Sequence, residues 1–200
     1  MVPTDALDAL LDGFIPHPAL RRRHQTLVRA PAAFALEAAR KFDLRSAPLV
    51  RAIFRLRAII LGAKAPGTDW SRSFLDEMLQ MGWAILAQAQ DRWLVMGTVC
   101  QPWVADVVMR PLPPGRFAAC AEPGQVKIVW TLEAEPLDEA RCRFTTETRA
   151  AGTDAEAQAR FRRYYRRFGV GMMLVRMLLL PAVRRQAERQ WRARTAPRAE

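Results

Sequence analysis

The sequence predicts an α+β domain in which an antiparallel sheet packs against one long C-terminal helix. Residues 82–149 contain short apolar and β-branched segments separated by turn residues, which is the pattern of successive strands. Residues 155–191 instead carry apolar side chains three or four positions apart, which indicates a helix. Strands grouped together and followed by one amphipathic helix are typical of the α+β class. The length of 200 residues suits a single domain.

Four helices and one strand are expected before the main run of strands. Residues 4–14 predict a short amphipathic helix, and residues 23–28 predict the first strand. Two helices then follow, at residues 31–42 and 48–61, the first with Pro31 at its opening position. Residues 62–70 read as a loop. Ser73 stands three positions before Asp76, and this spacing predicts the start of a short helix at 74–80.

Six strands are expected between residues 82 and 149. Turn signals such as Pro113-Pro114-Gly115 and Pro123-Gly124 separate them. The predicted strands are residues 83–90, 93–101, 105–110, 116–121, 125–135 and 141–149.

Charged residues predict how the last two strands pair. If residues 136–140 form the turn, Glu135 faces Arg141 and Glu133 faces Arg143. The same register places three further pairs on the opposite face of the sheet, namely Leu132 with Phe144, Trp130 with Thr146, and Ile128 with Thr148. One face is therefore expected to be charged and the other apolar with a few hydroxyl groups.

Glu147 and Arg149 fall on the charged face in this register, together with Lys127. We expect them to form an ion pair at the surface, which would contribute little to stability. A buried acid or base role would require a shift of the strand by one residue. On this interpretation Glu147→Gln leaves both ligand uptake and stability unchanged.

The C-terminal helix is expected to begin after Asp154, as its N-cap or first-turn acid, and to bury one stripe of side chains. The stripe runs through Phe161, Tyr165, Phe168, Met172, Val175, Leu179 and Ala182. Gly169, Gly171 and Pro181 disfavour helix, so breaks or kinks are expected at 169–171 and 180–181.

Nearly all of the net charge of +11 lies near the C-terminus. Residues 160–200 contain 12 arginines and only two acidic residues. Two interpretations stand: a solvated outer face, which we favour, or attraction to an anionic membrane surface through Arg162, Arg163, Arg166 and Arg167. No aromatic platform or helix-turn-helix pattern accompanies the charge, so a nucleic-acid partner is not expected.

Signals for catalysis or metal binding are sparse. The only histidines, His17 and His24, lack metal-ligand spacing, and Cys100, Cys120 and Cys142 lie far apart in the sequence. We therefore expect no metal, no cofactor, and reduced thiols in a cytoplasmic protein. The acidic N-terminal region does not have the pattern of a secretory signal, and no apolar run reaches 18 residues.

Several segments resemble uncharacterised bacterial members of the START-like, polyketide-cyclase and lipid-transport superfamily (SRPBCC), which has the helix-grip fold. They cover most of residues 20–190. The segments are RHQTLVRAP at 23–31, LRSAPLVRAIFRLR at 44–57, GWAILAQAQDRWLVMGTV at 82–99, FAACAEPGQVKIVWTLEAEP at 117–136, RCRFTTETRA at 141–150, and FRRYYRRF with LVRMLLLPAVRRQAE between 161 and 188. The resemblance implies a curved antiparallel sheet around the long helix, two short helices after the first strand, and a cavity for an apolar molecule between sheet and helix.

The predicted domain spans residues 21–192, with an N-terminal extension at 1–20 and a disordered tail at 193–200. The expected function is to bind or carry a small hydrophobic molecule or lipid. A cyclase or aromatase-type enzyme using the same cavity is the alternative, as is membrane or partner binding through the Arg-rich helix, and whether any reaction is catalysed is left open. The candidate ligand-binding residues are Trp83, Trp103, Ile128, Trp130, Leu132, Phe144, Thr146, Tyr164, Tyr165 and Phe168.

Overall fold

The computed structural model describes residues 4–62 and 73–196. Most of the predicted loop at 62–70 and the end of the predicted tail therefore lie outside the described residues. The helices are α1 (Thr4–Phe14), α2 (Ala32–Arg40), α3 (Pro48–Leu61), α4 (Phe74–Gln80), α5 (Pro114–Ala118) and α6 (Ala155–Thr195), with a short 3-10 helix at Leu44–Ser46. The strands are β1 (Leu20–Val28), β2 (Ala84–Ala89), β3 (Trp93–Cys100), β4 (Val126–Asp138) and β5 (Arg141–Gly152).

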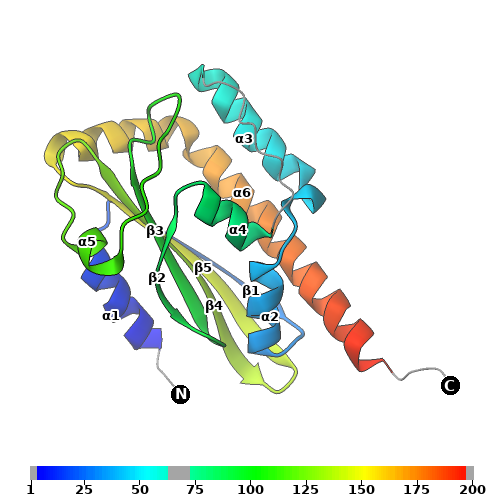
Figure 1. The fold of residues 1–200 in the computed structure, drawn as a ribbon. Helices are drawn as coiled ribbons and strands as arrows, with labels where there is room; N and C mark the ends of the chain where they lie inside the picture. The colour runs from blue at the N-terminus through cyan, green and yellow to red at the C-terminus, as the bar shows by residue number, and fades with distance from the viewer. Residues whose placement is uncertain (1–3, 63–72, 197–200) are drawn as a thin grey trace.

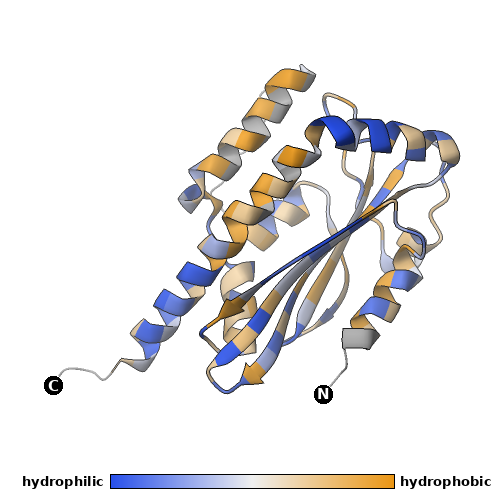
Figure 2. Ribbon diagram, turned by 180° about the vertical axis from the view of Figure 1, so that it is seen from behind, coloured by the Kyte–Doolittle hydropathy of each residue, from blue (hydrophilic) through white to orange (hydrophobic). Residues whose placement is uncertain are grey.

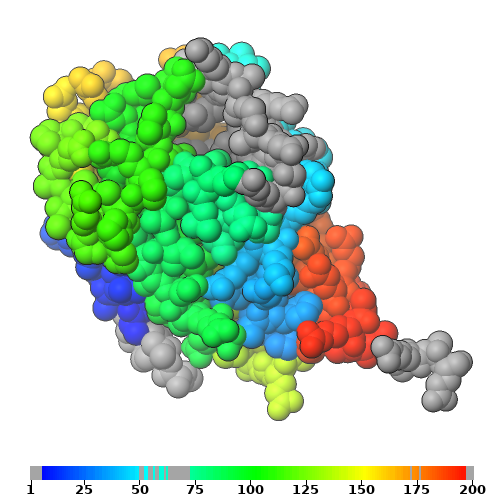
Figure 3. Space-filling view, in the orientation of Figure 1, coloured from blue at the N-terminus to red at the C-terminus, as the bar shows by residue number. Residues whose placement is uncertain are grey.

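The strands form one antiparallel sheet in the order β1-β5-β4-β3-β2. Helices α2, α4 and α6 lie on one side of it, which we call the inner face, and α1 lies on the other, the outer face (Figure 1). The space-filling view shows α2 adjoining the α4–β2 segment on one side and the C-terminal part of α6 on the other (Figure 3). The predicted α+β class is confirmed, with its antiparallel sheet, long C-terminal helix, and two helices after the first strand.

The register between β4 and β5 differs from the prediction by two residues. Glu135 lies opposite Arg143 and bonds to it at 2.7 Å, Trp130 lies opposite Thr148, and Leu132 lies opposite Thr146. The strands continue to a tight turn at Glu139–Ala140, where Asp138 accepts a bond from Arg141. Since side chains alternate with a period of two, a shift of two leaves every residue on its predicted face.

Two of the six expected strands are wrong. The segment at 105–110 is irregular apart from one bridge between Arg110 and Val99. The segment at 116–121 overlaps α5, which begins at Pro114 with the extended Pro113 as its N-cap. Proline has no N–H to donate to a sheet but suits the first turn of a helix, so these prolines favour the helix over a strand.

Helix α6 runs unbroken for 41 residues from its N-cap at Asp154, so the predicted breaks do not occur. It changes direction where its colour passes from yellow to orange in Figure 1, which is the region of the kink predicted near 169–171. Close packing explains the glycines: a Cβ at Gly169 would lie 3.0 Å from the Tyr165 ring, and one at Gly171 would touch Ile53 of α3. Leu179, Ala182 and Val183, on both sides of Pro181, pack against a cluster that includes Phe42 and Leu44 and hold the helix together there.

The observed domain is longer than predicted at both ends. Helix α1 lies within the predicted N-terminal extension, yet it buries Leu7, Leu11 and Phe14 against Val95 and Val129 on the outer face. Helix α6 continues to Thr195, so residues 193–195 are helical and not a disordered tail. The helix predicted at 4–14 is confirmed, but nothing local in the sequence indicates where its apolar face packs.

The junction between β5 and α6 provides a test of the fold. A Cβ on Gly152 would lie 2.7 Å from the Cα of Gln158, and closer still to its backbone nitrogen. Backbone atoms in the first turn of a helix cannot move aside as a flexible side chain can. Gly152→Ala is expected to lower the free energy of unfolding by about 3 kcal/mol, measured by urea denaturation. Gly115→Ala, whose Cβ meets nothing within 4 Å and which lies in helix α5, should not lower it. Equal stabilities of the two variants would contradict this packing.

Candidate functional site

An apolar cavity lies between the inner face of the sheet and the helices that cover it. Its volume is about 50 Å³. The wall combines side chains from β4 and β5 with side chains from α2, α4, α6 and the residue Phe42. The lining residues are Ala39, Phe42, Phe74, Trp130, Leu132, Phe144, Thr146, Leu179, Leu180 and Val183.

Four of the ten predicted binding residues meet at this cavity: Trp130, Leu132, Phe144 and Thr146. All four come from β4 and β5, because the predicted faces of these strands are correct. Phe74 at the start of α4 closes one side, its ring 5.3 Å from that of Trp130 in an edge-to-face arrangement. The lining residues on α2, α4 and α6 were not among the candidates. The predicted stripe of the C-terminal helix could have identified Leu179 as a lining residue, but no pattern in the sequence indicates Phe74 or Leu180.

The other six candidates lie elsewhere. Trp83 is buried in the main core. Ile128 bridges that core and a second cluster, in which Trp103, Tyr164, Tyr165 and Phe168 pack with Leu20, Val126 and Phe161. The Tyr164 and Phe168 rings are 5.1 Å apart. This second cluster lies under the first part of α6, and the cavity lies under a later part. The predicted stripe of α6 therefore packs against the second cluster at its start and lines the cavity further along.

Thr146 carries the one hydroxyl group among the described side chains of the cavity wall. It is 5% exposed, and its hydroxyl has no hydrogen-bond partner within the part of the chain that the structure describes. A buried polar group without a partner is costly, and such groups in a folded protein call for an explanation. A hydroxyl both donates and accepts, so this group is suited to a polar atom of a bound molecule.

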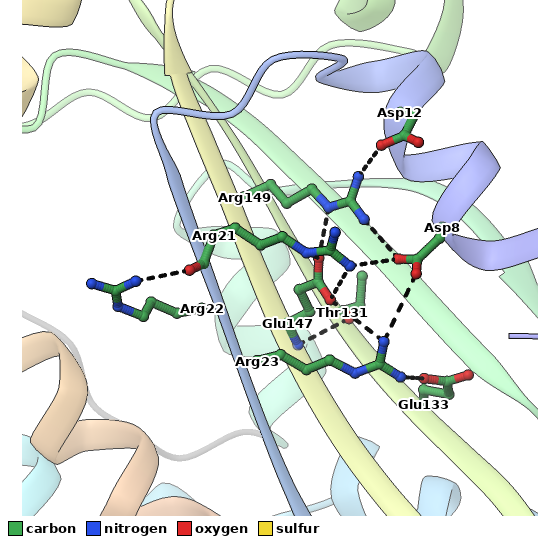
Figure 4. A network of polar contacts seen from close by, with 9 residues as sticks. All are labelled: Asp8, Asp12, Arg21, Arg22, Arg23, Thr131, Glu133, Glu147 and Arg149. Atoms are coloured by element: carbon green, nitrogen blue, oxygen red, sulfur yellow. Dashed lines mark hydrogen bonds and ion pairs between the residues drawn. The ribbon is translucent and has the colours of Figure 1, made fainter. Parts of the chain in front are cut away.

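A network of charged side chains occupies the opposite, outer face of the sheet (Figure 4). Arg149 lies at its centre and is 1% exposed. Its guanidinium donates to Glu147 at 2.6 Å, to Asp8 at 2.7 Å, and to Asp12. The two aspartates come from successive turns of α1, so the network joins that helix to the centre of the sheet.

Glu147 is held by several partners in this network. It is 3% exposed, and Arg21 on β1 lies 2.9 Å from its carboxylate. The backbone N–H of Glu147 donates to the hydroxyl of Thr131 at 3.1 Å. Although burial opposes it, the hydrogen bond with Glu147 and the charges of Glu147 and Asp8 together raise the pKa of Arg21.

The expected surface pair of Glu147 and Arg149 is therefore corrected. Both residues lie on the predicted face and they do bond to each other, but α1 covers them. Glu147→Gln is therefore no longer expected to leave stability unchanged, because it would remove the charge of a buried carboxylate that forms ion pairs. All the network carboxylates lie on the face of the sheet away from the cavity, so we assign the network to holding α1.

No group of three or more His, Cys, Asp or Glu side chains is placed to hold a metal ion within residues 4–62 and 73–196. The three cysteines are free, with Cys100 and Cys142 buried and Cys120 half-buried. Burial raises the pKa of the Cys142 thiol to about 11, which keeps it protonated and unreactive near neutral pH.

Comparisons with known proteins give one resemblance. No family model matches the chain, and no curated protein matches it. Among solved structures, an aromatase/cyclase named Zhui from Streptomyces sp. R1128 is similar over 89% of this chain and 99% of its own, at 17% sequence identity and a TM-score of 0.32. A likeness of that strength carries no argument about this chain, so its function is argued from its own residues. No described helix is both long enough and apolar enough to span a membrane.

The Arg149 network predicts a large effect from a single substitution. Arg149→Met leaves Glu147 buried with less compensation and removes one ion-pair partner each from Asp8 and Asp12, so the free energy of unfolding should fall by about 3 kcal/mol. Arg143→Met on the same strand breaks the exposed pair with Glu135 and should cost under about 1 kcal/mol. Adding Glu147→Gln to Arg149→Met should recover part of the loss. If urea denaturation finds the two single variants equally stable, the network does not hold α1.

The cysteines predict a reactivity pattern. In the native protein at pH 8.5, iodoacetamide should modify Cys120 and spare Cys142, because a thiol with a pKa of about 11 stays protonated there. Mass spectrometry of tryptic peptides measures both sites at once. The unfolded thiol ionises near its ordinary value of 9.0. The contribution of Cys142 to stability is therefore complete below pH 9 and is lost as the pH rises through 11. Rapid native modification of Cys142 would contradict its burial.

Proposed function

We propose that this protein binds a small apolar molecule that carries one hydrogen-bonding group, in the cavity between β4, β5 and α6. The observation that carries the proposal is the buried hydroxyl of Thr146, which has no partner among the described residues and lies in a wall of otherwise apolar side chains. Ligand sites are mostly apolar with a few placed polar groups, and this wall has that composition. A lipid-like or polyketide-like molecule with a carbonyl or hydroxyl group meets these requirements.

The ligand must widen the cavity as it binds. Sites for drug-sized molecules occupy roughly 300–1,000 Å³, whereas this cavity measures about 50 Å³. The sheet side of the wall is fixed by continuous pairing of β4 and β5. The helix side, with Phe74 on α4 and Leu179 and Val183 on α6, is where side chains can move without breaking strand pairing. Binding is therefore expected to rearrange the helix side.

Binding without covalent chemistry fits this wall better than the cyclase-type alternative. Proton transfer needs a titratable group next to the reacting atoms. None of the described lining side chains ionises near neutral pH, since they are apolar apart from Thr146. We therefore propose carriage or sensing of the apolar molecule in place of a reaction.

A stability measurement tests the role of Thr146 without knowledge of the ligand. Thr146→Val keeps the shape and removes a hydroxyl that has no partner among the described residues, so the free energy of unfolding of the empty protein should stay level or rise by about 1 kcal/mol. Thr98→Val is the matched control: its hydroxyl donates to the Gly82 carbonyl at 2.9 Å, and its loss should cost about 1 kcal/mol. Equal destabilisation by both would mean that the Thr146 hydroxyl is already satisfied.

A cavity-filling substitution tests binding itself. Val183→Phe projects a ring into the cavity, so it should weaken binding of the apolar dye N-phenyl-1-naphthylamine at least tenfold, measured by fluorescence titration. Leu137→Phe adds the same ring at an exposed position in the β4–β5 hairpin and should bind as the native protein does. Native mass spectrometry should detect a co-purified molecule that Val183→Phe lacks. The proposal fails if both variants bind the dye equally.

A further inference from the structure

The middle of α6 exposes a row of large apolar side chains. Val170 is 63% exposed, and Met173, Leu174 and Met177 are also exposed. The four positions are spaced by three or four residues and so form one stripe along the helix. We call them the α6 stripe. Clustered exposed apolar groups on a folded protein mark an interaction surface, whereas single scattered ones do not.

Helix α3 carries a second exposed stripe beside the first. Ile59 is 74% exposed, and Leu49, Leu56 and Ile60 are exposed as well. These four residues are the α3 stripe. The two helices lie side by side at one end of the molecule, where Gly171 of α6 approaches Ile53 of α3 (Figure 1). Seen from behind, both helices show hydrophobic residues over this stretch (Figure 2).

Arginines continue the same face of α6. Arg163, Arg166 and Arg167 are exposed and stand three or four positions apart, in step with Val170. Arg163 lies about 10 Å along the helix from Val170, at 1.5 Å per residue. None of Arg162, Arg163 and Arg166 forms an ion pair with another described residue.

Every charged residue in the sequence around both stripes is an arginine. Helix α6 has eight arginines and no acidic residue between Glu156 and Glu188. The sequence of α3 has three arginines and no acidic residue. A partner that covers the stripes must therefore be apolar where they enter it and negatively charged beside them.

We propose that the α3 and α6 stripes dock on a lipid bilayer that contains anionic phospholipids. The apolar side chains would enter the boundary between headgroups and acyl chains, and Arg162, Arg163, Arg166 and Arg167 would contact the phosphates. A second copy of this chain is a poorer occupant, because a symmetric contact through the stripes would bring the two arginine rows together. Loss of the stripes and loss of cavity binding are separable, since none of the stripe residues lines the cavity.

Vesicle co-sedimentation of the full-length protein tests the proposal. The probes are vesicles of phosphatidylcholine alone and of phosphatidylcholine with 30% phosphatidylserine. We expect binding to the mixed vesicles at 0.1 M NaCl, weaker binding at 0.5 M NaCl because exposed charges are screened, and little binding to phosphatidylcholine alone. Met173→Glu with Met177→Glu, and separately Arg163→Glu with Arg166→Glu, should each reduce the partition constant at least tenfold.

Matched substitutions on other surfaces serve as controls. Leu137→Glu places the same acid on an exposed apolar position in the β4–β5 hairpin, and Arg116→Glu reverses an exposed charge on α5. Both should bind mixed vesicles as the native protein does. Circular dichroism melts confirm folding, which exposed substitutions should preserve.

Two results would overturn the proposal. One is that the mixed vesicles do not retain the native protein, or retain all variants alike. The other is that sedimentation velocity finds a dimer that Met173→Glu with Met177→Glu dissociates, since a second copy would then cover the stripes. The two stripe variants should bind the dye as the native protein does. A negative result with vesicles would therefore overturn the membrane proposal and leave the cavity proposal to be tested by dye binding.

Discussion

The pairing of β4 with β5 determines what each face of this molecule contains. These two strands form the centre of the sheet, and alternate side chains point to opposite sides. Trp130, Leu132 and Thr146 therefore face the helices, while Thr131, Glu147 and Arg149 face α1. An apolar cavity and a charged network lie back to back, separated by one backbone layer.

The buried guanidinium of Arg149 explains why acidic side chains gather on the outer face of the sheet. A guanidinium removed from water needs compensating charge and hydrogen bonds. Glu147 supplies one partner from the same strand, and Asp8 and Asp12 supply two from a helix at the other end of the sequence. Together with the apolar contacts of Leu11 and Phe14, these ion pairs make α1 part of the domain.

Helix α6 connects the two proposed surfaces. Val170, Met173, Leu174 and Met177 are exposed at one end of the molecule. Leu179, Leu180 and Val183, which follow them along the helix, line the cavity. A molecule taken from a bilayer would thus meet the exposed stripe close to the cavity wall. The proposed membrane docking and the proposed ligand binding therefore use neighbouring parts of α6, but they depend on different side chains.

Local patterns in the sequence were enough to predict which face of β4 and β5 each residue occupies, the caps at Ser73 and Asp154, and the long final helix. These features depend on alternation, on helical spacing and on neighbours within a few residues. The register could not be predicted, because Glu133 and Glu135 can pair with Arg141 and Arg143 in more than one alignment, and the tight turn at Glu139–Ala140 selects one of them. The glycines of α6 correctly indicated a kink, whereas Pro181 does not break the helix because the packing around it outweighs local preference.

Tertiary structure alone decided which residues meet. Burial of Glu147 and Arg149 depends on a helix more than 130 residues away, and no spacing rule reports such a contact. The cavity takes four strand residues that the alternation placed correctly, but its helix side depends on how α2, α4 and α6 settle on the sheet. The exposed stripes are equally a product of assembly, because an apolar helix face reads the same in the sequence whether the fold covers it or leaves it to a partner.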